Sequence, residues 1–263
     1  MLQTHGLTVR FGGHVAVNAV SCRFEPGTLT AIVGPNGAGK TTYFNLISGQ
    51  LPASEGRVHL DGQELTGLSA SARTRAGLGR AFQLTNLFPN LTVLENVRLA
   101  VQATEEGEHL RGLNLWSIWQ DHAKLTQQAQ GILHQVSMMP QANATVASLP
   151  HGDQRKLEVA LLMALQPSVY MFDEPTAGMS QDEAPVILNL IRQLKSDKSK
   201  TILLVEHKMD VVRELADRII VLHNGQLVAD GEPAEVMASA VVQEAYLGAK
   251  PSAPQTAKAQ KGE

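Results

Sequence analysis

The chain has 263 residues, enough for one large domain or two small ones with a substantial core. Hydrophobic residues make up 43% of the sequence and charged residues 18%, which is typical of a globular rather than a disordered protein. Because 22 Lys and Arg residues are set against 25 Asp and Glu residues, the formal net charge is −3. The sequence therefore lacks the cationic excess of a protein whose main partner is nucleic acid.

No segment predicts export or membrane insertion. The opening six residues contain no cationic region followed by an apolar one, so no secretory signal is visible. The longest nearly apolar stretch, 159–172, is interrupted by Gln166, Pro167 and Ser168 and is shorter than the roughly 18–20 residues that a bilayer requires. The single cysteine, Cys22, cannot form an internal disulfide. We therefore expect a cytoplasmic protein.

The first 60 residues predict short β-strands separated by turns. Residues 29–33 and 57–60 are β-type runs, and the second ends in the hairpin pair Asp61-Gly62. Residues 40–49 then predict a helix closed by a glycine. This order of elements indicates a β-rich N-terminal part with one early helix.

The middle third of the chain predicts helices. Thr92 and Glu95 have the spacing of a capping box, and the helix that they open is expected to reach about Ala103. A break rich in Gly and Glu at 105–108 is expected to precede a long helical stretch ending near Gln135.

The last third alternates between strands and helices. The continuous apolar run 169–172 is typical of a strand covered on both faces. A helix, a strand, a helix and a strand are expected to follow at 183–195, 201–205, 209–215 and 218–222. This alternation predicts a parallel sheet wrapped by helices. No internal repeat is present, which indicates one such unit and not a tandem pair.

The C-terminal segment closes with a hairpin, a helix and a tail. Asn224-Gly225 predicts the turn of a last hairpin, and a helix is expected near 241–247. The tail from Lys250 onward contains two prolines, three lysines and no large apolar residue, so we expect it to be disordered.

A phosphate-binding loop follows the predicted strand at 29–33. The pattern G-x-x-x-x-G-K-[ST] comprises Gly34, Pro35, Asn36, Gly37, Ala38, Gly39, Lys40, Thr41 and the adjoining Thr42. Its glycines allow successive main-chain N–H groups to surround phosphate oxygens at the start of a helix. Lys40 would provide charge to the β- and γ-phosphates, and the Thr41 hydroxyl would bind Mg²⁺. The loop predicts a nucleoside triphosphate and Mg²⁺ as ligands.

Two carboxylates are expected at the carboxyl end of a parallel strand, where open α/β sheets bind their ligands. The run 169–172 leads directly into Asp173 and Glu174. Asp173 would hold Mg²⁺ directly or through water, and Glu174 would orient or deprotonate the attacking water.

With these motifs the sequence resembles the ATP-binding cassette ATPases from about residue 7 to 248. Gln83, in Gly-Arg-Ala-Phe-Gln, matches the family's Q-loop, and His207, in Leu-Leu-Val-Glu-His, matches its switch histidine. The resemblance implies that Gln83 senses Mg²⁺ and the γ-phosphate, and that His207 contacts the γ-phosphate. Phe11 looks like the aromatic residue that stacks on adenine, although a core role at a strand end is the alternative.

The resemblance implies an α/β fold with a RecA-like parallel-sheet core, an antiparallel β subdomain and an inserted α-helical subdomain. The core is expected at 1–84 and 166–231, and the helical subdomain at about 85–165. C-terminal helices are expected at 232–248 and a disordered tail at 249–263. Residues 1–248 would form a single nucleotide-binding domain.

The segment that matches the family signature departs from its usual Leu-Ser-Gly-Gly-Gln. Leu149 is followed here by Pro150, His151, Gly152 and Asp153. The resemblance implies that this segment faces the γ-phosphate bound by a partner cassette. Pro150 removes a hydroxyl whose hydrogen bond to a charged group is worth about 1.5–3 kcal/mol, which His151 could replace if protonated. The carboxylate of Asp153 needs a partner such as Arg155 or Lys156.

Several local sequences resemble the ATPases of branched-chain amino acid importers and their relatives for urea, amides and aromatic acids. They are Phe-Gly-Gly at 11–13 and the segments 87–96, 152–155, 177–180 and 242–248. The resemblance implies a second ATPase subunit, membrane permeases at the inner face of the membrane and, indirectly, a periplasmic solute-binding protein. The apolar loop 87–89 is equally compatible with a core role and with docking to a permease.

Three other functions stay open at this point. A non-transport cassette acting on nucleic acid or ribosomes would usually carry paired cassettes, a charged arm or a coiled coil, which this sequence lacks. A P-loop kinase would have no use for Gln83, the signature segment and His207 together. The change at Pro150 would also suit an asymmetric pair of subunits in which only one site turns over.

Overall fold

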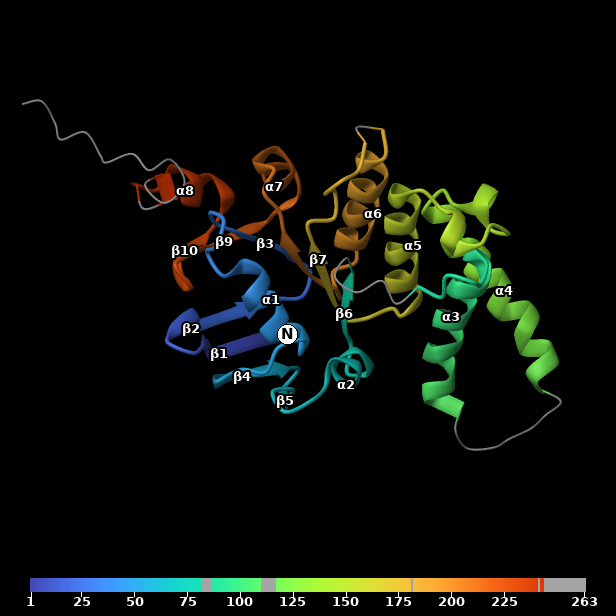
Figure 1. Ribbon diagram of the computed structural model, residues 1–263, viewed down its shortest axis with the longest axis horizontal. Coiled ribbons are helices and arrows are strands. Elements are labelled where there is room, and N and C mark those ends of the chain that lie inside the picture. Colours follow the sequence, from blue (N-terminus) through green and yellow to red (C-terminus); the bar gives the residue numbers. More distant parts are fainter. Residues whose placement is uncertain (82–86, 110–116, 181, 241, 244–263) are drawn as a thin grey trace, which may run out of the picture.

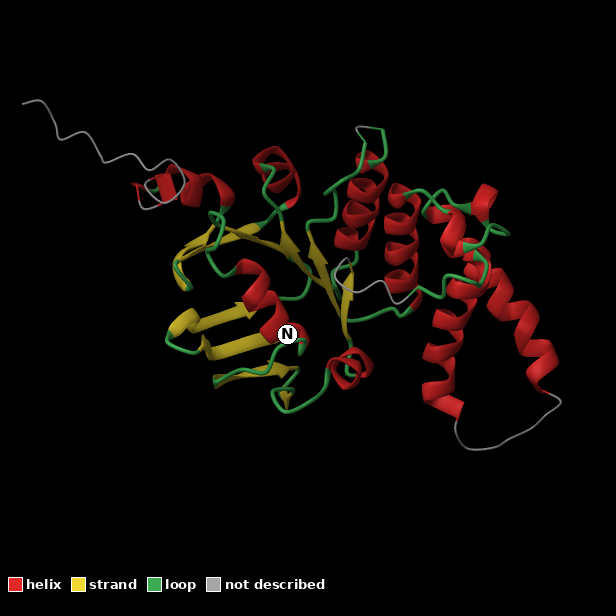
Figure 2. Cartoon of the chain, in the orientation of Figure 1, coloured by secondary structure: helices red, strands yellow, loops and turns green. Residues whose placement is uncertain are grey.

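Two β-sheets and the helices that pack around them make up the part of the chain that the computed structural model describes (Figure 1). Figure 2 shows the strands gathered on one side of the molecule and the longest helices on the other. The structure describes residues 1–81, 87–109, 117–180, 182–240 and 242–243.

The first sheet is antiparallel, with the strand order β2-β1-β4-β5. Its strands are β1 (Leu2–Phe11), β2 (His14–Phe24), β4 (Glu55–Leu60) and β5 (Gln63–Glu64). Asp61 and Gly62 join β4 to β5 with φ angles of 49° and 82°, as a turn with two left-handed residues requires. The hairpin predicted at Asp61-Gly62 is confirmed.

The second sheet has the order β10-β9-β3-β8-β7-β6 and is parallel except for β10, which pairs antiparallel with β9. Its strands are β3 (Leu29–Val33), β6 (Leu78–Ala81), β7 (Val169–Asp173), β8 (Thr201–Val205), β9 (Arg218–His223) and β10 (Gln226–Gly231). Every residue of β3, β7 and β8 is buried, because both faces of the sheet are covered. The predicted parallel sheet and the hairpin at Asn224-Gly225 are confirmed.

Helix α1 (Lys40–Ser48) lies between the two sheets (Figure 1). Its fully buried Tyr43 and Phe44 belong to a core cluster that also contains Phe24 of β2 and Leu203 of β8. The helix ends at Gly49, whose φ of 77° is the left-handed cap predicted from the sequence. A short helix, α2 (Ala70–Arg75), leads into β6.

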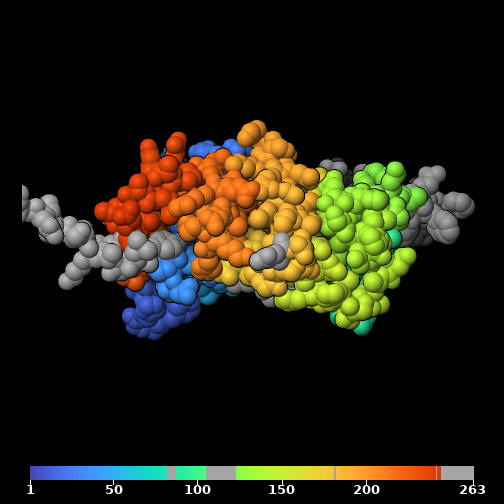
Figure 3. Space-filling model, turned by 90° about the horizontal axis from the view of Figure 1, so that it is seen from above, coloured from blue at the N-terminus to red at the C-terminus, as the bar shows by residue number. Residues whose placement is uncertain are grey.

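Three long helices lie between β6 and β7 in the sequence. They are α3 (Val93–His109), α4 (Ser117–Gln135) and α5 (His151–Ala164), with two 3-10 turns, Met139–Gln141 and Val146–Ser148, before α5. They pack around an apolar cluster to which Val97, Leu133 and Leu157 contribute. Figure 3 shows the middle of the chain gathered at one end of the molecule.

The capping box at the start of α3 is confirmed. The main-chain N–H of Thr92 donates to Glu95 Oε2 at 2.8 Å, and the N–H of Glu95 donates to Thr92 Oγ1 at 3.2 Å. The break predicted at 105–108 is wrong, because α3 continues to His109. That segment contains one glycine, and a single glycine inside a helix costs only about 1 kcal/mol.

The remaining helices are α6 (Ala184–Ser196), α7 (Met209–Leu215) and α8 (Pro233–Ala238). The first two confirm the predicted helices to within a residue at each end. The helix predicted at 241–247 lies almost wholly outside the described residues, and the tail at 249–263 lies outside them entirely. The division of the chain into subdomains stays a prediction. None of the described helices combines the length and apolarity that a membrane crossing needs.

Candidate functional site

The loop 34–39 follows a backbone path that needs glycine at particular positions. Gly37 and Gly39 have φ angles of 79° and 96°, in the region that side chains disfavour. A Cβ atom at Gly39 would also lie 2.6 Å from the carbonyl oxygen of Ala16, and one at Gly34 would overlap the carbonyl of Leu222. Gly39 caps the start of α1, so the loop turns its main chain directly into the helix N-terminus.

The side chain of Lys40 curls into this loop. Its Nζ donates hydrogen bonds to the carbonyl oxygens of Gly34 at 2.7 Å and of Pro35 at 2.9 Å. Lys40 is 6% exposed. Burial lowers the pKa of Lys40, and the nearby carboxylates of Glu174 and Asp173 act in the opposite direction. The ammonium group therefore lies within the electrostatic reach of both acidic residues.

A depression of about 330 Å³ brings the loop together with distant parts of the chain. Its lining residues are His14, Ala16, Asn36, Gly37, Ala38, Gly39, Lys40, Thr41, Thr42, Glu174 and His207. The sequence motifs identify all of these except His14 and Ala16, which lie on β2. The turn after β7 and the turn after β8 thus reach the same cavity as the phosphate loop.

Glu174 and His207 contact each other at the edge of this cavity. His207 Nε2 and Glu174 Oε1 are 2.6 Å apart, and the two side chains are 42% and 38% exposed. Glu174 has a φ of 50°, and its main-chain N–H donates to the carbonyl of Val205 at 2.9 Å. A non-glycine residue in the left-handed region is held there by its surroundings, in this case the end of the β7–β8 pairing.

Asp173, the last residue of β7, is paired with an arginine that the sequence motifs do not identify. Arg80 Nη2 donates to Asp173 Oδ2 at 2.7 Å, and Arg80 Nη1 donates to Asn45 Oδ1 at 2.7 Å and to Ser48 Oγ at 2.8 Å. Burial raises the pKa of Asp173, whereas Arg80 acts to lower it. The pair joins the ends of β6 and β7 to α1. An arginine inside the otherwise small or apolar run 78–81 is the only sequence signal for it.

The residues near the loop fit a magnesium ion whose remaining ligands would be phosphate oxygens. Thr41 offers a hydroxyl and Asp173 a carboxylate, both hard oxygen donors of the kind that Mg²⁺ prefers. Within the described residues, no group of three or more His, Cys, Asp or Glu side chains could hold a metal ion by itself. A site with few protein ligands is typical of Mg²⁺ bound together with a nucleotide.

Phe11 lies at the end of β1, opposite His14. Its side chain is 52% exposed, so the alternative of a core residue at a strand end is wrong. The exposed ring leaves a face available for stacking. Gln83, the predicted Q-loop residue, lies outside the described residues.

The segment 150–153 begins helix α5 and does not line the phosphate-loop cavity. Pro150 is the N-cap residue and provides no side-chain cap. Asp153 is paired with Lys156, whose Nζ lies 2.9 Å from Asp153 Oδ1, which identifies one of the two partners that the sequence left open. A Cβ atom at Gly152 would overlap the carboxylate of Glu183, a contact that sequence motifs do not indicate.

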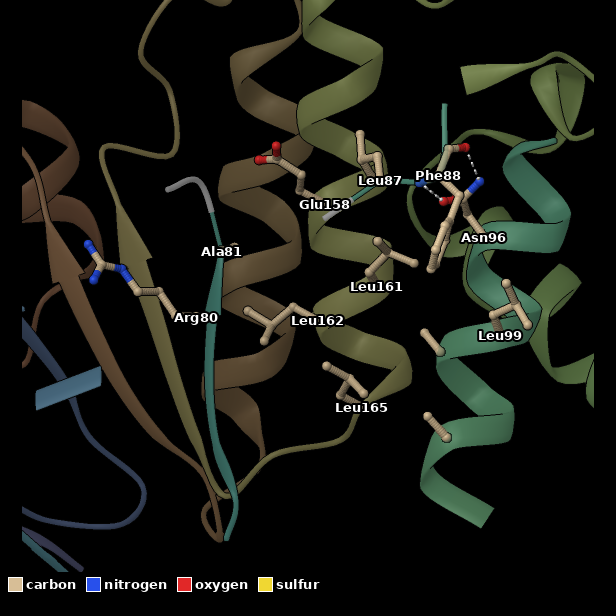
Figure 4. A pocket seen from close by; sticks show the side chains of 12 residues that line it. Arg80, Ala81, Leu87, Phe88, Asn96, Leu99, Glu158, Leu161, Leu162 and Leu165 are labelled. Atoms are coloured by element: carbon tan, nitrogen blue, oxygen red, sulfur yellow. Dashed lines mark hydrogen bonds between the residues drawn. The ribbon is translucent and has the colours of Figure 1, made fainter. Parts of the chain in front are cut away.

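A second surface feature lies between α3, α5 and the loop that follows β6 (Figure 4). This groove has a volume of about 380 Å³, and its apolar lining includes Leu87, Leu99, Leu161 and Leu165. Leu87 packs against the core, whereas Phe88 is 55% exposed. Leu87 therefore has the core role, whereas docking through the exposed Phe88 stays a prediction.

The buried side chain of Asn96 fixes the exposed loop at Phe88. Asn96 Oδ1 accepts from the main-chain N–H of Phe88 at 2.8 Å, and Asn96 Nδ2 donates to the carbonyl of Phe88 at 3.1 Å (Figure 4). Asn96 is only 2% exposed. The backbone that presents the Phe88 ring at the groove is thus anchored to α3.

Comparisons with known proteins show which family the chain is similar to. Residues 17–177 match the family model "ABC transporter", and residues 226–250 match "Branched-chain amino acid ATP-binding cassette transporter". The chain is 36% identical to the high-affinity branched-chain amino acid transport ATP-binding protein BraF of Pseudomonas aeruginosa over 94% of this chain and 98% of that one. It is 37% identical to LivG of Escherichia coli K12 with the same coverage.

Solved structures show the same fold. A nucleotide-free ATP-binding cassette from an ABC transporter superposes with a TM-score of 0.77 at 27% identity, covering 94% of this chain and 98% of that one. The ADP conformation of the ATP-binding cassette MJ1267 gives a TM-score of 0.76 at 30% identity, covering 95% and 99%. The predicted fold, with its parallel core, antiparallel sheet and helices, is confirmed. This chain belongs to the ABC transporter family of ATPases, in the branch of the branched-chain amino acid cassettes.

Proposed function

We propose that this chain hydrolyses ATP to drive an importer of branched-chain amino acids or related small polar solutes. The observation that carries the proposal is the single cavity in which the phosphate loop meets Glu174 and His207. The names of the relatives BraF and LivG support the class of solute. The chain would lie on the cytoplasmic face of the inner membrane, held there by permease subunits.

ATP would bind with its phosphates inside the loop 34–42. The main-chain N–H groups at the start of α1 would surround the phosphate oxygens, and Lys40 would exchange its two carbonyl partners for the β- and γ-phosphates. The exposed ring of Phe11 would stack on the adenine. Thr41, Asp173 and Gln83 would hold Mg²⁺, which supplies charge neutralisation at the phosphates when it is bound.

Glu174 and His207 would organise the attack of water on the γ-phosphate. Glu174 lies at the cavity edge, where its carboxylate would accept a proton from the water or orient it. His207 contacts Glu174 at 2.6 Å and would contact the γ-phosphate from the other side. The bond formed joins the water oxygen to phosphorus, and the bond broken releases ADP.

A second ATPase subunit would complete each site. A solved cassette, MJ0796, is dimeric in a post-hydrolysis state with ADP and phosphate, at 25% identity and a TM-score of 0.74 over 89% of this chain and 99% of that one. Residues 150–153 lie at the start of α5 and do not line this chain's own phosphate-loop cavity, and they would face the nucleotide of the partner. Counting ATP hydrolysed per dimer in a single turnover distinguishes two active sites from one.

The groove beside Phe88 would receive the permease. It is apolar, open to the surface and presents an exposed aromatic ring, as partner surfaces commonly do. Strand β6 forms part of it through Ala81, and the neighbouring Arg80 reaches Asp173. A shift of β6 on docking would therefore move Arg80 relative to Asp173 and change the candidate magnesium site.

Two matched variants separate docking from nucleotide binding. Phe11 and Phe88 are the large hydrophobic side chains that are exposed within the described residues. Phe88→Ser should abolish co-purification with the permease subunits and leave ATP affinity unchanged. Phe11→Ser should weaken ATP binding by about 2- to 10-fold, the value of one aromatic stack, and leave co-purification intact. The reverse pattern would contradict the assignment.

Transport itself tests the solute class. The chain, its permeases and the cognate periplasmic binding protein, reconstituted in proteoliposomes with ATP, should accumulate leucine, isoleucine or valine. Uptake that occurs equally without ATP, or co-purification with ribosomes or DNA in place of permeases, would contradict the proposed function.

A further inference from the structure

A buried carboxyl group lies directly behind the contact between Glu174 and His207, and the proposed chemistry does not use it. Glu206 follows the last residue of β8 and is 3% exposed. Its Oε1 accepts a hydrogen bond from the hydroxyl of Thr176 at 2.7 Å. Its Oε2 accepts from the main-chain N–H groups of His207 at 2.8 Å and Lys208 at 3.2 Å.

These bonds join two segments that leave the sheet side by side. Strands β7 and β8 pair in parallel up to Asp173 and Val205, and the last main-chain bond runs from Glu174 N–H to the carbonyl of Val205. Beyond that bond, Glu206 continues the connection through its side chain. One of its oxygens holds the segment that carries Glu174, and the other holds the segment that carries His207.

The contact between Glu174 and His207 is not able to align these segments by itself. Both side chains are more than a third exposed, and contacts between exposed polar side chains contribute little to stability because water competes for them. Thr176 is 1% exposed and Glu206 is 3% exposed, so their bonds are shielded from water. The buried connection is therefore the stronger of the two.

We propose that Glu206 is a positioning residue for ATP hydrolysis. The carboxylate of Glu206 accepts hydrogen bonds from the hydroxyl of Thr176 and from the two main-chain N–H groups after Glu206. These bonds hold His207 against Glu174 in the geometry needed for attack on the γ-phosphate. This inference rests on the proposed function, because it assigns a role to the side chain that supports those two residues. Glu206 itself touches neither nucleotide nor water in this scheme.

The first test compares Glu206→Ala with Glu206→Gln. Glu206→Ala removes all three bonds and should lower kcat for ATP hydrolysis on the order of 100-fold, the cost of misplacing a catalytic group by about 1 Å, with ATP affinity unchanged. In Glu206→Gln the amide oxygen can accept from the N–H groups and the amide nitrogen can donate to Thr176. This variant should therefore recover most of the lost turnover. Wild-type turnover in Glu206→Ala would overturn the inference.

A second pair of variants applies if Glu206→Ala does not fold. Thr176→Val removes only the hydroxyl and should lower kcat by about 2- to 10-fold, the value of one hydrogen bond. Thr176→Ser keeps the hydroxyl and should recover most of that loss. An equal effect of Val and Ser on kcat, or an effect on ATP affinity alone, would overturn the inference.

A spectroscopic measurement reports the geometry without activity. As a single substitution, Glu174→Gln should shift the ¹⁵N signal of His207 Nε2 relative to the wild type, because the side chains of residues 174 and 207 are in contact. In the Thr176→Val background the same change should shift that signal much less, and an equal shift would overturn the inference. If the wild-type chain with its permeases hydrolyses no ATP, the proposed function fails; if it hydrolyses ATP and Glu206→Ala does so equally, only this inference fails.

Discussion

The guanidinium of Arg80 donates to the carboxylate of Asp173 at 2.7 Å, in a pair whose side chains are only 7% and 8% exposed. The same guanidinium bonds to Asn45 and Ser48 of α1 and lies over the ring of Phe44, 5.1 Å from its centroid. One side chain thus joins the helix that begins at the phosphate loop to the strand that ends in the acidic residues.

Removing this arginine should destabilise the fold. Arg80→Met leaves the carboxyl of Asp173 buried without its ion partner, so the free energy of unfolding should fall by about 3–5 kcal/mol. Urea unfolding measures the change. The double variant Arg80→Met with Asp173→Asn removes the uncompensated charge and should recover part of the loss. A double variant less stable than Arg80→Met would show that the ion pair is not the cause.

Replacing the candidate general base should separate ATP binding from ATP hydrolysis. Glu174→Gln keeps the size of the side chain and removes its basicity, so turnover should fall by at least about 100-fold. Affinity for ATP, measured with a fluorescent nucleotide, should stay close to that of the wild type, since the phosphate loop is untouched. Near-normal turnover by the variant assembled with its permeases would remove Glu174 from this role.

Two glycines of the phosphate loop should differ in their tolerance of alanine. Gly37 and Gly39 both have positive φ angles, so either substitution should cost about 1–2 kcal/mol from the backbone. A Cβ at Gly37 meets nothing within 4 Å, whereas one at Gly39 lies 2.6 Å from the carbonyl oxygen of Ala16. Gly39→Ala should therefore lose about 1–3 kcal/mol more, the cost of overpacking. Equal unfolding midpoints would contradict the close approach of Gly39 to Ala16.

The capping box of α3 should make stability depend on pH. The main-chain N–H and the hydroxyl of Thr92 bond to the carboxylate of Glu95 and lower its pKa. Because the folded state has the lower pKa, the carboxylate stabilises the fold at neutral pH, and this contribution is lost as the pH falls through the lowered pKa. Glu95→Gln should thus unfold at lower urea than the wild type at neutral pH.

The difference between Glu95→Gln and the wild type should narrow on acidification toward about pH 3, below the ordinary carboxyl range. In a Thr92→Ala background, which lacks the hydroxyl, replacing Glu95 should produce a smaller pH-dependent difference. A gap that widens as the pH falls would show that the carboxylate does not act through this cap.

Local patterns predicted the local parts of the site. The phosphate loop comprises nine consecutive residues after a strand. Its glycines, Lys40 and Thr41 could therefore be identified without any knowledge of the sheet order. The turns at Asp61-Gly62 and Asn224-Gly225 could be predicted for the same reason. Each depends on φ angles that the residues at those positions favour on their own.

The connections between distant segments could not be predicted from patterns. That His207 contacts Glu174 follows from the adjacency of β7 and β8, which the sequence does not specify. Arg80 and Glu206 are charged side chains that become buried only because their partners come from other elements. The residues next to Arg80 and Glu206 in the sequence do not predict which side chains they bond to, because burial and pairing depend on tertiary packing.

The loop 34–42 is expected to hold a triphosphate whose terminal group faces Glu174 and His207. A crystal structure of Glu174→Gln with ATP and Mg²⁺ tests it directly. We expect the γ-phosphate within hydrogen-bonding distance of Lys40 Nζ and His207, with Thr41 and Asp173 as ligands of the metal ion. Nucleotide bound elsewhere, or a γ-phosphate remote from residues 174 and 207, would contradict it.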